Sequence, residues 1–404
     1  MTTFHPDAEL VALARRRDVS GRVLDGTLTL LGASGRQVHL LNGSAAAIWN
    51  AIDEGTTFDE LVGTITERFA ADEKVVRADV VDALPSFADL LDVDLGSSSM
   101  VEAPATGSKR IGGCGRFSRR IGPFQALEST VTVEAAARLA ESVVKDLFDD
   151  LEAVLAPLVR CSTTAAKVLA SQITLRIDMV EDQLHPPRWV LYRNGERVAE
   201  VLTVPAVRAA VLAEINAAPI DALVESVGWH AGAVELPAGV VVFPGHSNAG
   251  KSTLVTQLVA RGHGYLTDEA VAVDVVSRQV LSFPKSVCVD PGGKSLFAEL
   301  ATPSQDSWPT WHVDPKRIGP GRLGTPGKPV AFVFPTYERN AAVALEQLSR
   351  HEALDALLEN SFDFAKVGAA GASLMLAFAD VTPCYRLRHG GQPEHLELLE
   401  SHFA

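Results

Sequence analysis

The 404-residue sequence has only four cysteines, and no two of them are close enough in the chain to form a metal-binding pair. We therefore expect reduced thiols of a cytoplasmic protein rather than a disulfide framework at Cys114, Cys161, Cys288 and Cys384. The sequence also lacks any apolar run that approaches the length of a membrane span, and its first residues lack the apolar core of a signal peptide. These absences predict a cytoplasmic protein with no membrane partner.

Positive charge is also scarce, since 36 Lys and Arg residues stand against 50 Asp and Glu residues and give a formal net charge of -14. Because phosphate backbones bind basic surfaces, this balance disfavours nucleic acid as the main partner. The chain is 47% hydrophobic and 21% charged, which is a globular composition. At this length we expect about two or three domains.

Two stretches with little periodic pattern divide the chain. Residues 94–123 are rich in Gly, Ser and other small residues, which is typical of a linker. Residues 303–329 are rich in Pro and Gly, as in loops that border a site. We expect a small N-terminal domain, a flexible linker, a mixed α/β region and a catalytic domain, over residues 1–95, 96–121, 122–228 and 229–404.

The N-terminal region has the pattern of a hairpin followed by three helices, as in a winged helix. The segment "RVLDGTLTLLGASGRQVHLLN" alternates like a hairpin, with its turn at 32–35. Asn42 can cap a first helix, and Thr57 with Glu60 forms a capping box that opens a second. The second helix has an apolar face at helical spacing, formed by Phe58, Leu61, Val62, Ile65 and Phe69. We expect Pro85 to kink or restart the third helix.

The rest of the chain mixes strand and helix patterns. We expect a strand near 129–133, a long helix over 135–158 and a strand at 173–177. An Asn194-Gly195 pair predicts a hairpin turn, and a further helix follows Pro205. From Trp229 onward strands and helices alternate, so the predicted fold class is α/β, with a sheet covered by helices.

The most specific motif follows a short apolar strand at 239–243. It fits G-x-x-x-x-G-K-[ST] in full, and the nucleotide-binding residues that it predicts are Gly245, His246, Ser247, Asn248, Ala249, Gly250, Lys251, Ser252 and Thr253. Backbone N–H groups of such a loop hold phosphate oxygens, while Lys251 balances charge on the β- and γ-phosphates. Since the Ser252 hydroxyl reaches the metal, the motif predicts ATP and Mg²⁺ as cofactors.

An acidic pair follows the next predicted strand. Asp268 and Glu269 would stand beside the γ-phosphate, where one carboxylate can accept a proton and the other can hold Mg²⁺. We assign Asp268 as the general base and Glu269 to the metal, and the reverse assignment stays open. His230 is a third catalytic candidate, which would contact phosphate, orient Asp268, or serve only the structure.

This region resembles the core of HPr kinase/phosphorylase and, more closely, the HPr-kinase-related proteins found with modified peptides. His230 lies fifteen positions before Gly245, as the upstream histidine of that family does. An Arg-Gly-His turn follows the helix at 261–263, and the acidic pair stands where HPr kinase has two aspartates. The resemblance implies a P-loop kinase core, and these relatives suggest a homo-oligomer, although no interface is legible in the sequence.

The resemblance weakens beyond the acidic pair. The later glycine-rich signature that HPr kinases use around HPr and in phosphorolysis is not evident, and "SVCVDPGGKSLF" occupies that region. HPr as the substrate and the reverse reaction are therefore not expected. We expect Lys285 and Lys294 to contact a phosphate or an acidic substrate, whereas Lys316 and Arg317 are weaker candidates because solvated loop charges are commoner.

Residues 19–95 resemble the PqqD-like peptide-recognition domain. The likeness lies in Leu41-Asn42, Ala46, Ile48-Trp49, Thr56-Thr57 and Asp79-Val80. In that family a leader peptide adds as an extra strand beside the hairpin and packs against the third helix. The resemblance implies a precursor-peptide partner for residues 1–95. The alternative is a small winged-helix core that binds no peptide.

Together the two resemblances imply a phosphotransferase that moves the γ-phosphate of ATP to a Ser or Thr hydroxyl of a ribosomally synthesised precursor peptide. Capture of that peptide by the N-terminal domain would raise its effective concentration near the P-loop. Two alternatives remain open. One is a kinase for a small hydroxylated metabolite, and the other is a nucleotide-gated chaperone in peptide maturation that transfers no phosphate.

Overall fold

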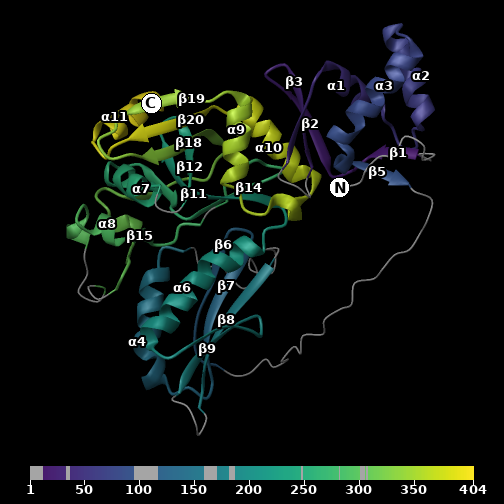
Figure 1. Ribbon diagram of the computed structural model, residues 1–404. Coiled ribbons are helices and arrows are strands. Elements are labelled where there is room, and N and C mark those ends of the chain that lie inside the picture. Colours follow the sequence, from purple (N-terminus) through teal and green to yellow (C-terminus); the bar gives the residue numbers. More distant parts are fainter. Residues whose placement is uncertain are drawn as a thin grey trace. The chain divides into compact units, whose positions relative to one another are not determined.

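The computed structural model shows a mixed α/β protein with several sheets (Figure 1). The residues that it describes are 12–32, 37–94, 117–158, 171–181, 187–246, 249–281, 283–300, 305 and 308–404. The chain forms two compact units. The first contains residues 1–107, 349–358 and 364–381, and the second contains 108–348, 359–363 and 382–404. Within the described residues, no helix combines the length and the apolar character that a membrane span requires.

The first unit opens with a three-stranded antiparallel sheet in the order β2-β3-β4, at Val19–Leu24, Thr27–Gly32 and Val38–Leu41. The predicted hairpin therefore contains one strand more than we expected. The additional turn is Asp25-Gly26, with φ of 46° and 82°, as a two-residue hairpin turn requires. Of the predicted turn at 32–35, Gly32 ends β3 and residues 33–35 lie outside the described residues. β1 (Ala12–Arg15) pairs with β5 (Leu91–Asp94) and joins the two ends of this region.

Three helices follow the sheet, at α1 (Gly43–Ala51), α2 (Phe58–Phe69) and α3 (Glu73–Ala83). The side chain of Asn42 caps α1, and Thr57 with Glu60 forms the capping box of α2, so both predicted helix starts are confirmed. α3 ends before a single 3₁₀ turn that contains Pro85. Phe69 differs from the expected apolar face, since it is 55% exposed at the last residue of α2.

Two helices from late in the chain belong to this first unit. They are α9 (Arg350–Glu359), of which residues 350–358 are included, and α10 (Ala369–Val381). α10 packs against β2 and β3 (Figure 1). Arg22 of β2 forms an ion pair of 2.9 Å with Asp380 of α10. This grouping differs from the expected catalytic domain over 229–404. Its physical reason is that α10 is apolar around most of its surface, and such a helix needs cover on several sides.

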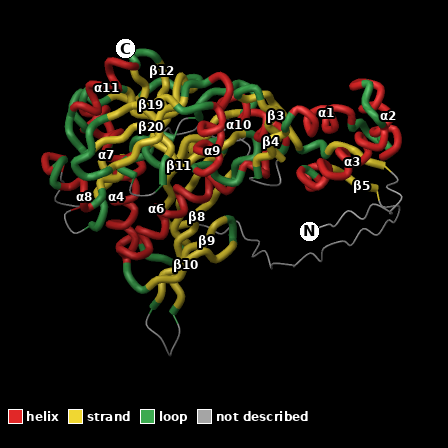
Figure 2. The backbone as a smooth tube through the Cα atoms, turned by 45° about the horizontal axis from the view of Figure 1, so that its top comes forward, coloured by secondary structure: helices red, strands yellow, loops and turns green. Residues whose placement is uncertain are grey.

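The second unit begins with a five-stranded sheet in the order β10-β9-β8-β7-β6. Its strands are β6 (Phe117–Ala126), β7 (Ser129–Ala136), β8 (Ser171–Val180), β9 (Arg188–Arg193) and β10 (Glu196–Val201). Two helices, α4 (Glu141–Leu155) and α6 (Val204–Asp221), lie side by side against this sheet (Figure 2). The last residues of the expected linker over 96–121 belong to the sheet, because β6 begins at Phe117. The expected helix over 135–158 starts later, since β7 continues to Ala136.

The larger sheet of this unit has eight strands in the order β17-β13-β11-β12-β18-β20-β19, with β14 paired to β11. Its strands are β11 (Ser226–Leu236), β12 (Gly239–Pro244), β13 (Gly264–Thr267), β14 (Ala270–Asp274), β17 (Arg322–Leu323), β18 (Pro329–Tyr337), β19 (Ala344–Gln347) and β20 (Cys384–His389). The helices α7 (Lys251–Ala260) and α11 (Glu394–His402) contribute to the core of this sheet. The expected boundary at residue 229 falls inside β11.

Strand direction gathers several loops at one edge of this sheet. β12, β18 and β20 are parallel, and β13 runs the same way because both it and β12 are antiparallel to β11. The carboxyl ends of all four strands therefore lie at the same edge, which is where α/β sheets bind ligands. Two further strands, β15 (Val287–Val289) and β16 (Trp311–Val313), form a small antiparallel pair. In the chain, β15 comes before the short helix α8 (Pro291–Lys294), and β16 comes after it.

Candidate active site

The predicted phosphate loop joins the carboxyl end of β12 to the start of α7, so the strand-loop-helix context is confirmed. Gly250 caps α7 with φ of 83°, a left-handed conformation that glycine adopts without strain. The N–H of Gly245 donates to the carbonyl of His230 at 3.1 Å, which ties the beginning of the loop to β11. Ser247 and Asn248 lie outside the described residues.

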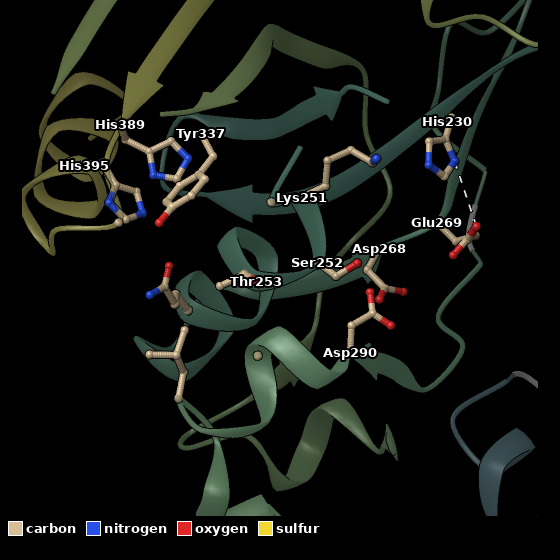
Figure 3. Close-up of a pocket in the computed structure, with 16 residues that line it drawn as sticks. His230, Lys251, Ser252, Thr253, Asp268, Glu269, Asp290, Tyr337, His389 and His395 are labelled. Carbon is tan, nitrogen blue, oxygen red and sulfur yellow. Dashed lines mark ion pairs between the residues drawn. The ribbon is translucent and has the colours of Figure 1, made fainter. Parts of the chain in front are cut away.

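A cavity of about 770 Å³ opens at this edge of the sheet (Figure 3). It is lined by several of the predicted site residues, namely His230, Gly250, Lys251, Ser252, Thr253, Asp268 and Glu269. Three other predicted loop residues, Gly245, His246 and Ala249, lie beside it without lining it. The structure thus brings the P-loop, the acidic pair and the upstream histidine to one cavity.

Lys251 is the buried cation of this cavity, with 5% of its surface exposed. Its Nζ donates to the carbonyl of His246 at 2.8 Å. Burial lowers the pKa of Lys251 to about 8, although the charges of Glu269 and Asp268 act in the opposite direction. The ammonium therefore gives up its proton more readily than an ordinary lysine would.

Asp268 is fully buried, and its side chain accepts from three donors. Oδ1 accepts from the Tyr265 hydroxyl at 3.0 Å and from Lys285 Nζ at 2.9 Å, and Oδ2 accepts from the N–H of Cys288 at 2.9 Å. One of these donors is the counter-ion Lys285, so the carboxylate oxygens are already engaged and are poorly placed to receive a substrate hydroxyl. These contacts disfavour our first assignment of Asp268 as the general base, and they leave Glu269 as the candidate for that role.

Glu269 differs from its neighbour, because 32% of its side chain is exposed and it lines the cavity. Burial raises the pKa of Glu269, while Lys285 and Lys251 oppose that shift. Nδ1 of His230 lies 3.9 Å from its carboxylate. Burial, with the charge of Lys251, lowers the pKa of His230 to about 4, so this imidazole is neutral near pH 7. His230 thus adjoins Glu269 rather than Asp268.

The two lysines that we expected to contact substrate are engaged elsewhere. Lys285 is 5% exposed, and its ion pair with Asp268 keeps the pKa of Lys285 above its usual range although burial alone would lower it. Lys294 Nζ donates to the Trp308 carbonyl at 2.7 Å and lies 4.8 Å from the centre of the Trp311 ring. Neither lysine lines the cavity. The weaker candidates Lys316 and Arg317 are exposed.

Several cavity residues were missed by the sequence argument. Asp290 stands between β15 and α8, and its carboxylate accepts from the Thr310 hydroxyl at 3.2 Å. Its only sequence signal is an acid directly after an apolar strand. Tyr337, His389 and His395 line the far end of the same cavity. In the sequence, the Gly390-Gly391 pair directly after a strand could have indicated that this end of the cavity lies there.

The residues present fit a magnesium ion that arrives with a nucleotide. Within the part of the chain that the structure describes, no three His, Cys, Asp or Glu side chains are grouped to hold a metal by themselves. Mg²⁺ is commonly bound by one or two carboxylates together with substrate phosphates. Ser252, Glu269 and Asp290 line the cavity and offer such oxygens.

Thiol chemistry is not supported at this site. Cys288 and Cys384 are free, and Cys114 and Cys161 lie outside the described residues. Burial raises the pKa of Cys288 to about 12, although Lys285 acts in the opposite direction. The thiol therefore stays protonated near pH 7 and is a poor nucleophile.

Comparison with known proteins supports the N-terminal resemblance. Residues 28–89 match the family described as coenzyme PQQ synthesis protein D (PqqD). Part of the chain is similar to the structure of the HPr(Ser) kinase/phosphatase from Coxiella burnetii, with a TM-score of 0.25 and 17% identity over 43% of this chain and 86% of that chain. No curated protein matches the chain. A TM-score of 0.25 does not show a shared fold. Residues 28–89 are therefore similar to PqqD, and the α/β unit that follows contains the predicted phosphate loop.

Proposed function

We propose that this protein is an ATP-dependent kinase that phosphorylates a Ser or Thr hydroxyl of a precursor peptide. The observation that carries this proposal is the joint presence of Lys251, Ser252 and Glu269 in one cavity, at the N-terminus of α7. A helix N-terminus and a lysine attract phosphate, and a partly exposed carboxylate can accept a proton.

Phosphate binding would use the beginning of α7. The backbone N–H groups from Lys251 to Thr253 belong to the first turn of α7, where N–H groups have no partner within the helix, and they suit phosphate oxygens. The Lys251 ammonium would exchange its contact with the His246 carbonyl for a phosphate oxygen. Ser252 would hold Mg²⁺ with Asp290, where the ion would neutralise charge on the β- and γ-phosphates.

Glu269 is the proposed general base. As the acceptor oxygen bonds to the γ-phosphorus, its proton passes to the Glu269 carboxylate. The bond from the γ-phosphorus to the β,γ-bridging oxygen breaks, and ADP leaves with that electron pair. Neutral His230, 3.9 Å away, would orient the Glu269 carboxylate. Asp268 and Lys285 would form the buried support beneath it.

Peptide capture would use the free edge of the N-terminal sheet. Within the described residues β4 pairs with β3 alone, which leaves its other edge open to strand addition. Leu40 on β4 is 56% exposed, so an apolar side chain is available beside that edge. These features agree with the peptide recognition that the PqqD resemblance implies.

The reaction can be tested with the full-length protein, MgATP and precursor peptides encoded near its gene. Mass spectrometry should detect the gain of one phosphate, and Lys251→Ala should abolish that gain. Transfer that persists in Lys251→Ala would contradict the P-loop assignment. Transfer only to small hydroxylated molecules would replace the peptide kinase with a metabolite kinase.

Recruitment has its own test in the same assay. Leu40→Asp should raise the KM for the peptide about tenfold with little change in kcat, because it weakens binding rather than chemistry. Val276→Asp is a matched control, since Val276 is an exposed apolar residue (88%) of the second unit. Equal KM values for the two variants would remove β4 from the proposal.

A further inference from the structure

The cavity extends past Thr253 to residues that the proposed transfer chemistry does not use. Tyr337 ends β18, His389 ends β20, and His395 lies in the first turn of α11. The parallel pairing of β18 and β20 sets Tyr337 opposite His389, and their rings are 5.7 Å apart in an edge arrangement. In Figure 3 these side chains lie at one end of the cavity, and the acidic pair lies at the other.

The two histidines have buried nitrogen atoms that lack protein partners. His389 is 5% exposed, and within the described residues neither of its ring nitrogens has a hydrogen-bond partner. His395 Nδ1 donates to the Gln392 carbonyl, which leaves its buried Nε2 as an unpaired acceptor. Burial lowers the pKa of His389 to about 4, so a neutral ring with one donor and one acceptor faces the cavity. Unpaired polar atoms at such depth are uncommon unless a ligand completes them.

Two glycines, Gly390 and Gly391, follow His389 and line the cavity without adding a side chain to it. Gly391 has φ of 91°, and a Cβ there would lie 3.4 Å from the ring of Tyr337. A Cβ on Gly390 would lie 2.9 Å from the N–H nitrogen of Ala341, so larger residues are disfavoured at both positions. Tyr337 itself is 52% exposed and presents an aromatic surface.

We propose that this end of the cavity binds the base of the nucleoside triphosphate, stacked against Tyr337 and hydrogen-bonded to His389. This inference rests on the proposed use of the P-loop for a nucleotide. With the γ-phosphate near Lys251 and Glu269, the phosphate chain runs along the first turn of α7 toward Thr253. The nucleoside then falls at the opposite end, where a base edge supplies the donors and acceptors that the histidines lack.

The experiment compares MgATP with magnesium tripolyphosphate, which carries the phosphates without a base. In calorimetric titrations of the full chain, His389→Ala should weaken MgATP binding about tenfold and leave tripolyphosphate binding unchanged. Tyr337→Ala should show the same selectivity, since loss of its stacking surface affects the base alone. His402→Ala is the matched control, because His402 is an exposed histidine of α11 that does not line the cavity.

Each outcome bears on one proposal. Unchanged MgATP affinity in both variants would overturn the base site. An equal loss of affinity for MgATP and for tripolyphosphate would also overturn it, because His389 would then support the P-loop instead. A selective loss of MgATP without any phosphate transfer to peptides would keep the base site and contradict the kinase. Weak binding of both ligands by the unaltered protein would contradict the nucleotide site itself.

Discussion

The carboxylates of Asp268 and Glu269 are adjacent in the chain but have different surroundings. Asp268 is enclosed by Tyr265, Lys285 and the N–H of Cys288, whereas Glu269 is partly exposed in the cavity. Glu269→Gln should therefore retain nucleotide binding and lose transfer about a hundredfold or more, the usual effect of removing an acid–base group. Titration with MgATP and a single-turnover rate measurement would separate the two effects. A rate near that of the unaltered protein would return the base role to Asp268.

The buried pair of Asp268 and Lys285 leads to a stability prediction. Lys285→Met would leave the Asp268 carboxylate buried without its cation, and such a loss costs about 3–5 kcal/mol. Urea denaturation should show this destabilisation, and adding Asp268→Asn should recover part of it because the uncompensated charge is gone. A Lys285→Met variant as stable as the unaltered protein would mean that the pair does not stabilise the fold.

Lys251 should make nucleotide binding depend on pH. Its pKa is lowered to about 8 by burial, so below that pH the ammonium is already charged and binding needs no proton uptake. Above it, binding must restore the proton, and the affinity for MgATP should fall by up to about tenfold per pH unit. Titrations from about pH 7 to about pH 9.5 would measure this slope. Lys251→Arg keeps its charge throughout that range, so it should lack the slope.

At the scale of elements, the start of α7 depends on the conformation of Gly250. Within the described residues a Cβ at Gly250 would meet nothing within 4 Å, so we expect the cost of Gly250→Ala to come from the left-handed φ of 83°. We expect a loss of about 1–2 kcal/mol in stability and weaker MgATP binding, because the first-turn N–H groups shift. Gly63→Ala is the matched control, since Gly63 lies in α2 with no positive φ and open space around it. That change should stabilise the protein by about 0.5–1 kcal/mol, and equal effects of both changes would contradict this account.

At the scale of the whole molecule, the PqqD domain is not a module that can simply be removed. α10 packs against β2 and β3, and Asp25 is paired with both Arg350 and His351. A fragment that begins at Ser108, the first residue of the second unit, would retain α9 and α10 without those strands. We expect it to bind a hydrophobic dye and to be cleaved by proteases within 349–381, where the full chain is protected. Equal protection in both proteins would show that these helices do not need the N-terminal sheet.

The sequence by itself determined the features that depend on neighbouring residues. The sequence predicted the strand-loop-helix around the phosphate motif, the caps at Asn42 and Thr57 and the Asn194-Gly195 turn, because backbone preferences and short-range hydrogen bonds set them. It also predicted a disturbance of the third helix at Pro85, where α3 in fact ends. The Asp25-Gly26 pair is also a local signal for a hairpin turn, although we did not predict a turn there. The PqqD family match at 28–89 likewise follows from the sequence.

Tertiary structure decided what depends on residues far apart in the chain. Whether Asp268 or Glu269 is buried depends on Lys285 and on the N–H of Cys288, seventeen and twenty residues beyond Asp268. Tyr337 and His389 lie opposite each other only because β18 and β20 pair in parallel. Lys285 forms a buried ion pair with Asp268 instead of contacting a substrate in the cavity. α10 joined the N-terminal sheet across more than three hundred residues. Burial and ion pairing between distant segments leave no local pattern, because they arise only when strand order and helix packing bring those segments together.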